Sequence, residues 1–181
     1  MLKFFLSTFM ALFFTACVTH SSIIIPPEPT VETIDKSTIF QLTIPVREHG
    51  YRNFDTKVLT TQLELDNFIA KVKKQKSWNQ KENFISSLTL LPIDFTKYNL
   101  LLYRITENSA STILAVDVPK GNNKHVLIEI GRNQPNIVTT DLAYYALAYK
   151  VAKSVQDITF DNGLKKDIIT NKKLILQKGK I

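Results

Sequence analysis

The sequence predicts a β-rich α+β domain, built as an antiparallel sheet or small β-sandwich with one principal helix. Three observations lead to this fold class. Several segments alternate apolar and polar residues with the period of two that is typical of half-buried strands. One long segment instead carries the period of an amphipathic helix. Short turn-forming stretches separate the strand segments, and consecutive strands joined by short turns pair antiparallel.

The first strand is predicted at residues 39–46, because alternate positions there are apolar: Phe40, Leu42, Ile44 and Val46. Residues 47–53 are expected to form a turn around Gly50. A second strand is predicted at residues 54–60, directly before the helical segment.

The principal helix is predicted to begin after Thr61, because Thr61 and Glu64 match a capping box. Apolar residues then recur at helical spacing on one face, namely Leu65, Phe68, Ile69 and Val72. The outer face carries lysines that favour the C-terminal end of the helix dipole and that we interpret as solvated: Lys71, Lys73, Lys74 and Lys76. A second, short helix is predicted at residues 82–87.

The remainder of the chain is predicted to alternate strands with turns. Further strands are expected at residues 98–106, 112–118, 124–131, 142–152 and 157–160. Segment 142–152 also suits a helix because of its alanines, but its period of two favours a strand. A basic tail begins at Leu164, and residues 173–176 are candidates to close the sheet.

The composition indicates one globular domain, predicted at residues 39–181. The chain has 181 residues, is 44% hydrophobic and carries a formal net charge of +7, which together exclude a wholly disordered protein. A single cysteine excludes an intramolecular disulfide framework and a cysteine-only zinc site. Three scattered histidines argue against a histidine-rich metal site. No metal or other cofactor is therefore predicted.

Residues 1–16 are predicted to be a lipoprotein signal peptide. Lys3 precedes an apolar run at residues 4–14, which is too short to cross a hydrocarbon layer of about 30 Å. The segment from Phe14 to Cys17 resembles the lipobox of bacterial lipoproteins, with phenylalanine where leucine is commoner. The resemblance implies cleavage before Cys17 and acylation of its thiol, because only a thiol forms the thioether to diacylglycerol.

Acylation of Cys17 predicts a protein of the bacterial cell envelope, held on a membrane by its N-terminal lipid anchor. Val18 is not the aspartate that retains lipoproteins at the inner membrane of enteric bacteria, which favours the outer membrane, facing the periplasm. Residues 17–38 are predicted to form the lipidated N-terminus and a proline-rich, extended tether. Within the tether, residues 23–25 leave open a short strand added to the domain.

No catalytic residue is predicted. The sequence lacks Gly-x-Ser-x-Gly, His-Glu-x-x-His and a glycine-rich phosphate loop. Any serine triad would need one of the three histidines, which we interpret as solvated or structural: His20, His49 and His125. Three aspartates stand at strand edges or turns, where aspartate is ordinary: Asp94, Asp117 and Asp141. Nucleic acid is not an expected partner, because an envelope protein of this charge first meets anionic head groups and cell-wall polymers.

A series of segments follows in a characteristic order along the chain: LELDNFIAKV, IDFTKYNLLLYRI, TENSAST, ILAVDV, HVLIEIG and TTDLAYYALAYKVAKSVQDITF. Together these segments, within residues 54–161, resemble the PrcB C-terminal-like family of bacterial secreted and lipoprotein domains. In that family an Asp-Phe pair, here Asp94-Phe95, precedes a hydrophobic strand. Several members then carry a Gly-Gly-Tyr-like turn, which residues 108–111 replace with Asn-Ser-Ala-Ser. The resemblance implies kinship with small β-sandwich protease inhibitors and association with partner proteases.

These observations favour a non-enzymatic, membrane-anchored protein-binding module. Its partner would be an unidentified envelope protein, and the family resemblance implies a protease that is bound, stabilised or inhibited. A structural envelope lipoprotein that contacts cell wall or anionic lipid through its basic surface is the alternative, and an unrecognised hydrolase is a weaker one.

The partner-binding surface is predicted at two turns, residues 106–111 and 132–141. Every second turn of an antiparallel sheet lies at the same end, so these two are expected to project together. The residues expected to bind the partner are Asn108, Ser109, Arg132 and Asn133. As surface residues, Asn108 and Arg132 are expected to be replaceable with little loss of stability.

Overall fold

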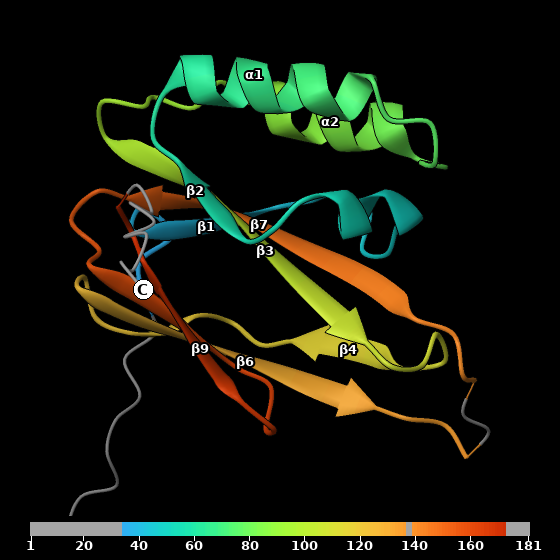
Figure 1. Ribbon diagram of the computed structural model, residues 1–181. Coiled ribbons are helices and arrows are strands. Elements are labelled where there is room, and N and C mark those ends of the chain that lie inside the picture. The colour runs from blue at the N-terminus through green and yellow to red at the C-terminus, as the bar shows by residue number, and fades with distance from the viewer. Residues whose placement is uncertain (1–33, 137–138, 173–181) are drawn as a thin grey trace, which may run out of the picture. The chain divides into compact units, whose positions relative to one another are not determined.

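The computed structural model describes residues 34–136 and 139–172 (Figure 1). Its helices are the 3-10 helix η1 (His49–Asn53), α1 (Gln62–Lys73) and α2 (Lys81–Thr89). Its strands are β1 (Ile39–Leu42), β2 (Lys57–Leu59), β3 (Tyr98–Glu107), β4 (Ile113–Val116), β5 (Lys120–Gly121), β6 (His125–Asn133), β7 (Ala143–Ala152), β8 (Asp157–Asp161) and β9 (Lys166–Thr170). The expected signal peptide, Cys17, His20, the strand at 23–25, most of the tether and residues 173–176 lie outside the described residues.

An antiparallel sheet with strand order β1-β7-β3-β2 forms the middle layer of the domain. Strands β3 and β7 pair along all ten residues of each. Both faces of this sheet are covered, so neighbouring residues on one strand enter different cores: Leu100 and Leu102 face the helices, and Leu101 faces the second sheet. The strand predicted at residues 142–152 is confirmed as β7.

Helices α1 and α2 cover one face of the middle sheet (Figure 1). Thr61 caps α1 as predicted, because its hydroxyl accepts a hydrogen bond from the backbone N–H of Glu64 at 3.2 Å. The Glu64 carboxylate in turn accepts from the N–H of Thr60 at 2.8 Å. The predicted apolar face of the helix is buried: Leu65, Phe68, Ile69 and Val72. The short second helix is confirmed as α2, which buries Phe84, Ile85 and Leu88.

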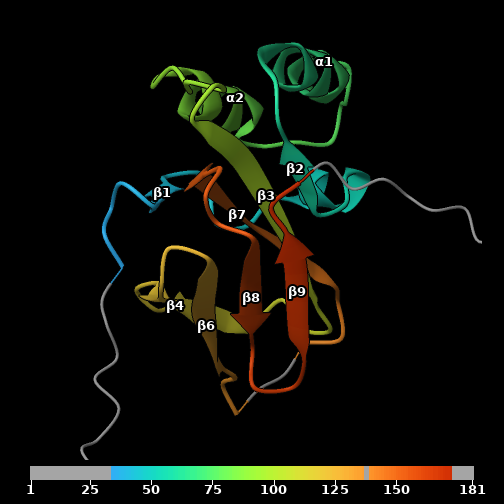
Figure 2. The same cartoon turned by 90° about the vertical axis from the view of Figure 1, so that its left-hand side faces the viewer.

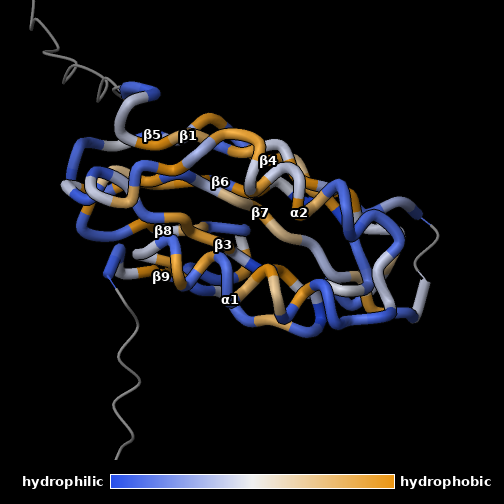
Figure 3. Tube along the Cα trace, turned by 90° about the horizontal axis from the view of Figure 1, so that it is seen from above, coloured by the Kyte–Doolittle hydropathy of each residue, from blue (hydrophilic) through white to orange (hydrophobic). Residues whose placement is uncertain are grey.

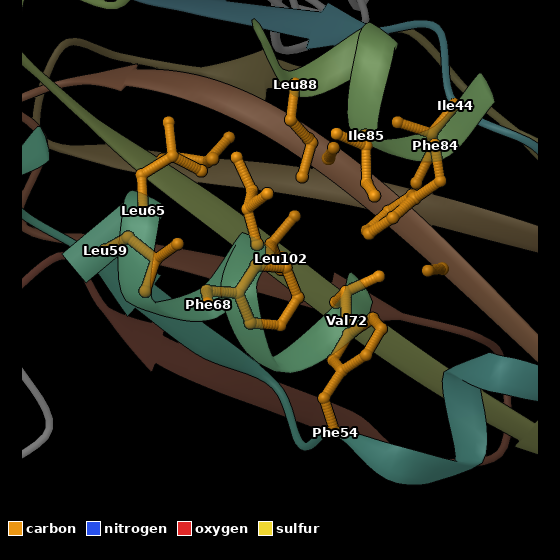
Figure 4. Packing of buried hydrophobic residues seen from close by; sticks show 14 of the residues in the cluster. Ile44, Phe54, Leu59, Leu65, Phe68, Val72, Phe84, Ile85, Leu88 and Leu102 are labelled. Carbon is orange, nitrogen blue, oxygen red and sulfur yellow. The ribbon is translucent and has the colours of Figure 1, made fainter. Parts of the chain in front are cut away.

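An aromatic cluster fills the space between the helices and the sheet, as the close view shows for part of it (Figure 4). Its members are Tyr51, Phe54, Phe68, Trp78 and Phe84. The rings of Tyr51 and Trp78 meet edge to face, with centroids 5.2 Å apart. Gly50 makes this packing possible, because a Cβ at that position would lie 1.9 Å from the Trp78 indole.

A second sheet packs on the other face of the middle sheet, with order β4-β6-β8-β9 and β5 paired to β6 (Figure 2). Strands β6 and β8 are parallel, with Val126 opposite Ile158, which departs from the expected antiparallel pairing. Between β6 and β8 the chain passes through β7 in the middle sheet. Strand β8 therefore enters the second sheet running in the same direction as β6. Tyr103 joins the two sheets: its ring stacks on Phe160 at 3.8 Å, and its hydroxyl donates to Asp167 at 2.6 Å.

Two hydrophobic cores result, one on each face of the middle sheet. Seen from above, apolar residues follow the strands and polar residues gather in the connections (Figure 3). The predicted fold class, a β-rich α+β domain with one principal helix, is confirmed. Residues between 34 and 172 form the two cores and the strand pairs described above.

Truncation of Phe68 is expected to destabilise the domain strongly. The side chain is 6% exposed, and its ring packs against those of Phe54 and Phe84. Phe68→Ala should lower the free energy of unfolding by about 3–5 kcal/mol, measured by urea denaturation. Leu63→Ala on the exposed side of the same helix, where the side chain is 69% exposed, should change it by less than about 0.5 kcal/mol. Equal stability of the two variants would contradict the packing.

Candidate functional site

Two connections meet at one end of the domain, which we call the turn end. They are residues 108–112, between β3 and β4, and the described part of residues 134–142, between β6 and β7. The hydroxyl oxygens of Ser109 and Thr139 are 3.1 Å apart, and Ser109 Oγ accepts from the N–H of Thr139 at 3.1 Å. A further contact joins the hydroxyls of Ser109 and Ser111 at 2.7 Å. The structure therefore brings the two connections together.

The four residues predicted to bind a partner differ in exposure. Asn108 and Asn133 are exposed, whereas the Ser109 side chain is buried in the contacts between the connections. Arg132 is half-buried and points at Glu107, to whose carboxylate oxygens its Nε donates at 3.0 and 3.1 Å. Ser109 and Arg132 thus hold the turn end together, and Asn108 and Asn133 face solvent.

The expectation that Arg132 is a solvated surface residue is wrong. Its partner Glu107 is only 3% exposed, so the carboxylate depends on the guanidinium for compensation of its charge. Removal of one member of a buried ion pair leaves the other charge uncompensated, which is costly. Sequence reasoning missed this pair because Glu107 is the last residue of its strand, and no local pattern distinguishes a buried carboxylate there from a solvated one.

A cavity of about 320 Å3 opens beside these connections. Four segments distant in sequence line it: residues 47–49, residues 79–80, Ala110 and residues 141–144. Its wall carries charged groups of both signs, the Tyr144 ring and the exposed side chain of Leu142. The sequence carries no signal that joins these segments, because each one is short and of ordinary composition.

Glu48 lines the cavity and joins two of the segments around it. Its carboxylate is 4% exposed and accepts from the backbone N–H groups of Asn79 and Gln80 at 3.0 and 3.2 Å. Gln80 is the N-cap of α2 and makes no side-chain capping bond, so Glu48 supplies the cap from another segment. A negative group at this position also suits the helix dipole.

Arg47 and Asp141 both line the cavity. The Arg47 guanidinium donates to the carbonyl of Ala110, which ties the segment before η1 to the β3–β4 connection. A hydrogen bond from the Thr139 side chain lowers the pKa of Asp141, and the charge of Arg47 acts in the same direction. Asp141 is therefore ionised at neutral pH.

The structure describes two of the histidines, His49 and His125. His49 packs edge to face on Tyr144, with ring centroids 6.0 Å apart. His125 lies on the second sheet, where its Nδ1 is 2.8 Å from a carboxylate oxygen of Asp157. Within residues 34–136 and 139–172, no group of three or more His, Cys, Asp or Glu side chains is placed to hold a metal ion. In the part of the chain that the structure describes, no helix is long and apolar enough to cross a membrane.

Comparisons of the chain with protein-family models, with curated proteins and with solved structures find no match.

The buried ion pair generates a stability prediction. Arg132→Ala should lower the free energy of unfolding by about 3 kcal/mol, because it leaves the Glu107 carboxylate buried and unpaired. Asn133→Ala, at the exposed neighbouring position, should change it by less than about 0.5 kcal/mol. Thermal and urea denaturation of the two variants test the difference, and an Arg132→Ala domain as stable as the parent would show that the pair is dispensable.

Proposed function

We propose that the protein is a membrane-anchored lipoprotein of the bacterial cell envelope whose domain binds another envelope protein without catalysing a reaction. The observation that carries this proposal is the turn end, where exposed side chains surround a cavity and buried hydrogen bonds fix the connections. Loops that a rigid scaffold holds in place are the usual seat of recognition. The middle sheet, covered on both faces, is such a scaffold.

The turn end is ordered before any partner arrives. Two buried carboxylates fix it from different sides: Glu48 caps α2, and Glu107 pairs with Arg132. The Ser109 hydroxyl joins the connection that bears Asn108 to the connection that follows Asn133. Binding at a surface already in place costs less conformational entropy than binding that must order loops, which favours recognition here.

The cavity fits one side chain of a partner. Arg47 and Asp141 offer a donor and an acceptor, while Leu142 is 53% exposed and gives an apolar contact at the rim. A partner side chain with an apolar stem and an amide or hydroxyl tip would use both kinds of group. Exposed apolar residues beside fixed polar groups are typical of the centre of protein interfaces.

The anchor is proposed from the sequence. Cys17 follows a signal-like apolar run and stands at the cysteine of a lipobox-like segment. Acyl chains at that position would hold the domain on a membrane leaflet through the tether of residues 17–38. A protease as the partner is supported by the resemblance of residues 54–161 to the PrcB C-terminal-like family.

Site-specific crosslinking in intact cells tests the binding surface. A photoreactive amino acid at Asn133 should give a discrete adduct with one envelope protein, and Leu142→Asp in the same chain should reduce that adduct at least tenfold. Ser154, exposed in the connection after β7 at the other end of the domain, is the matched control position and should give no such adduct. Adducts of equal intensity at both positions, or an adduct that Leu142→Asp leaves unchanged, would exclude the turn end as the binding surface.

Acylation generates a separate prediction. Cys17→Ser should abolish the added acyl mass and leave the protein soluble or with its signal peptide uncleaved, because serine cannot form the thioether. Ser21→Ala, four residues further on, should be acylated like the parent. Intact-mass measurement on the membrane fraction tests both variants, and a native chain with an unmodified Cys17 thiol would overturn the proposed anchor.

A further inference from the structure

The end of the domain opposite the turn end collects lysines from segments far apart in sequence. The described chain begins there at Ile34 and ends there at Lys172. This end faces the viewer in Figure 2. We call it the tether end. Its exposed lysines are Lys36, Lys97, Lys124, Lys153 and Lys172.

Backbone hydrogen bonds hold these segments side by side. The carbonyl of Thr38, two residues after Lys36, accepts from the N–H of Ala152 at 2.8 Å. The N–H of Lys153 donates to the carbonyl of Lys97 at 2.9 Å. The segments that carry Lys36 before β1, Lys97 before β3 and Lys153 after β7 are therefore held next to one another.

The remaining two lysines join the same surface through Gln156. The carbonyl of Lys124 accepts from the N–H of Gln156 at 2.7 Å, and the carbonyl of Gln156 accepts from the N–H of Asn171 at 2.8 Å. Lys172 directly follows Asn171, whose side chain is also bonded to the carbonyls of Ala152 and Val155. The fold thus gathers positive charge at the tether end.

Few of these charges are compensated locally. Lys97 lies 3.5 Å from Asp94, whereas the other four lysines take part in no ion pair among the described residues. Two further carboxylates belong to this end: Asp35, which accepts from the N–H of Ser37 at 2.9 Å, and Asp157, which contacts His125. Five lysines thus stand against three carboxylates. The surface therefore carries a net positive charge that attracts an anionic partner.

Exposed apolar side chains accompany the lysines. Leu90 and Leu91, at the end of α2 and the start of its connection to β3, are 78% and 57% exposed. Figure 1 places this connection at the end where the described chain begins. Exposed leucines at the same end of a domain as lysines suit the boundary between lipid head groups and acyl chains, where both kinds of side chain gain. Nucleic acid would be attracted by the lysines but would gain little binding energy from contact with the leucines.

We propose that the tether end lies against an anionic phospholipid surface. The proposal rests on the proposed function in one respect, namely that Cys17 anchors the chain in a membrane, because the tether joins the domain at this end. The turn end then points away from the lipid, toward the space in which a protein partner is met.

Vesicle cosedimentation tests the proposal with the chain from residue 18 onward, which lacks the acylated cysteine. It should bind vesicles of phosphatidylcholine and phosphatidylglycerol in a 7:3 ratio at about 0.1 M salt, and bind pure phosphatidylcholine vesicles much more weakly. Replacement of Lys36, Lys124 and Lys153 by glutamine should weaken the partition coefficient about 100-fold, since each lysine close to the surface contributes about fivefold.

The matched control removes the same charge from the other end of the helix layer: Lys71→Gln, Lys74→Gln and Lys76→Gln together. These lysines are also exposed, and the partition coefficient should fall less than about threefold. Equal weakening in the two triple variants would mean attraction by net charge alone and would overturn the proposal. Equal binding of the parent chain to neutral and anionic vesicles would also overturn it.

The outcome is separable from that of the proposed function. The chain from residue 18 has neither acyl chain nor protein partner, so weak vesicle binding would leave the crosslinking and acylation results standing. Conversely, an unmodified Cys17 or the absence of crosslinks at Asn133 would not change the vesicle result. A thermal unfolding curve for each triple variant, with a midpoint within about two degrees of the parent, shows that the comparison is made on folded protein.

Discussion

The antiparallel pairing of β3 with β7 is the interaction on which the other parts of the structure depend. The two strands form the middle of a sheet that is covered on both faces, so their backbone groups bond to each other, to β1 or β2 and to the segments beside those strands, such as Val46 and Glu48. Helices α1 and α2 close one face, and the second sheet closes the other. The β3–β7 pair therefore provides the apolar faces on which the helices and the second sheet pack.

Local sequence patterns predicted the elements better than their arrangement. The capping box at Thr61 and the apolar spacing from Leu65 to Val72 fixed α1, because capping and burial act within a few residues. The alternation in residues 142–152 identified β7 although alanine favours a helix, since packing on both faces outweighs a small intrinsic preference. The parallel pairing of β6 and β8 could not be predicted, because it depends on β7 leaving for the other sheet.

The candidate site shows the same division. Two turns were expected at one end of the domain. Asn108 and Asn133 are exposed there, as a binding surface requires. The burial of Glu107 and the capping of α2 by Glu48 depend on tertiary structure, because each carboxylate is buried beside a group from a distant segment. No local pattern distinguishes such a carboxylate from a solvated one, so sequence reasoning assigns Arg132 to solvent and overlooks the cavity.

The place of β1 in the sheet has a consequence for the order of folding. Ile39 pairs with Val151 and Leu42 with Ala148, so the first strand of the domain pairs with β7, more than 100 residues later in the chain. Between them the chain must form both helices and most of the second sheet. A chain that emerges from its N-terminus exposes β1 early and its partner late, so β1 cannot complete its pairing in the order of emergence. Until β7 is available, β1 and β3 both lack the strand that lies between them, which delays the closure of both cores.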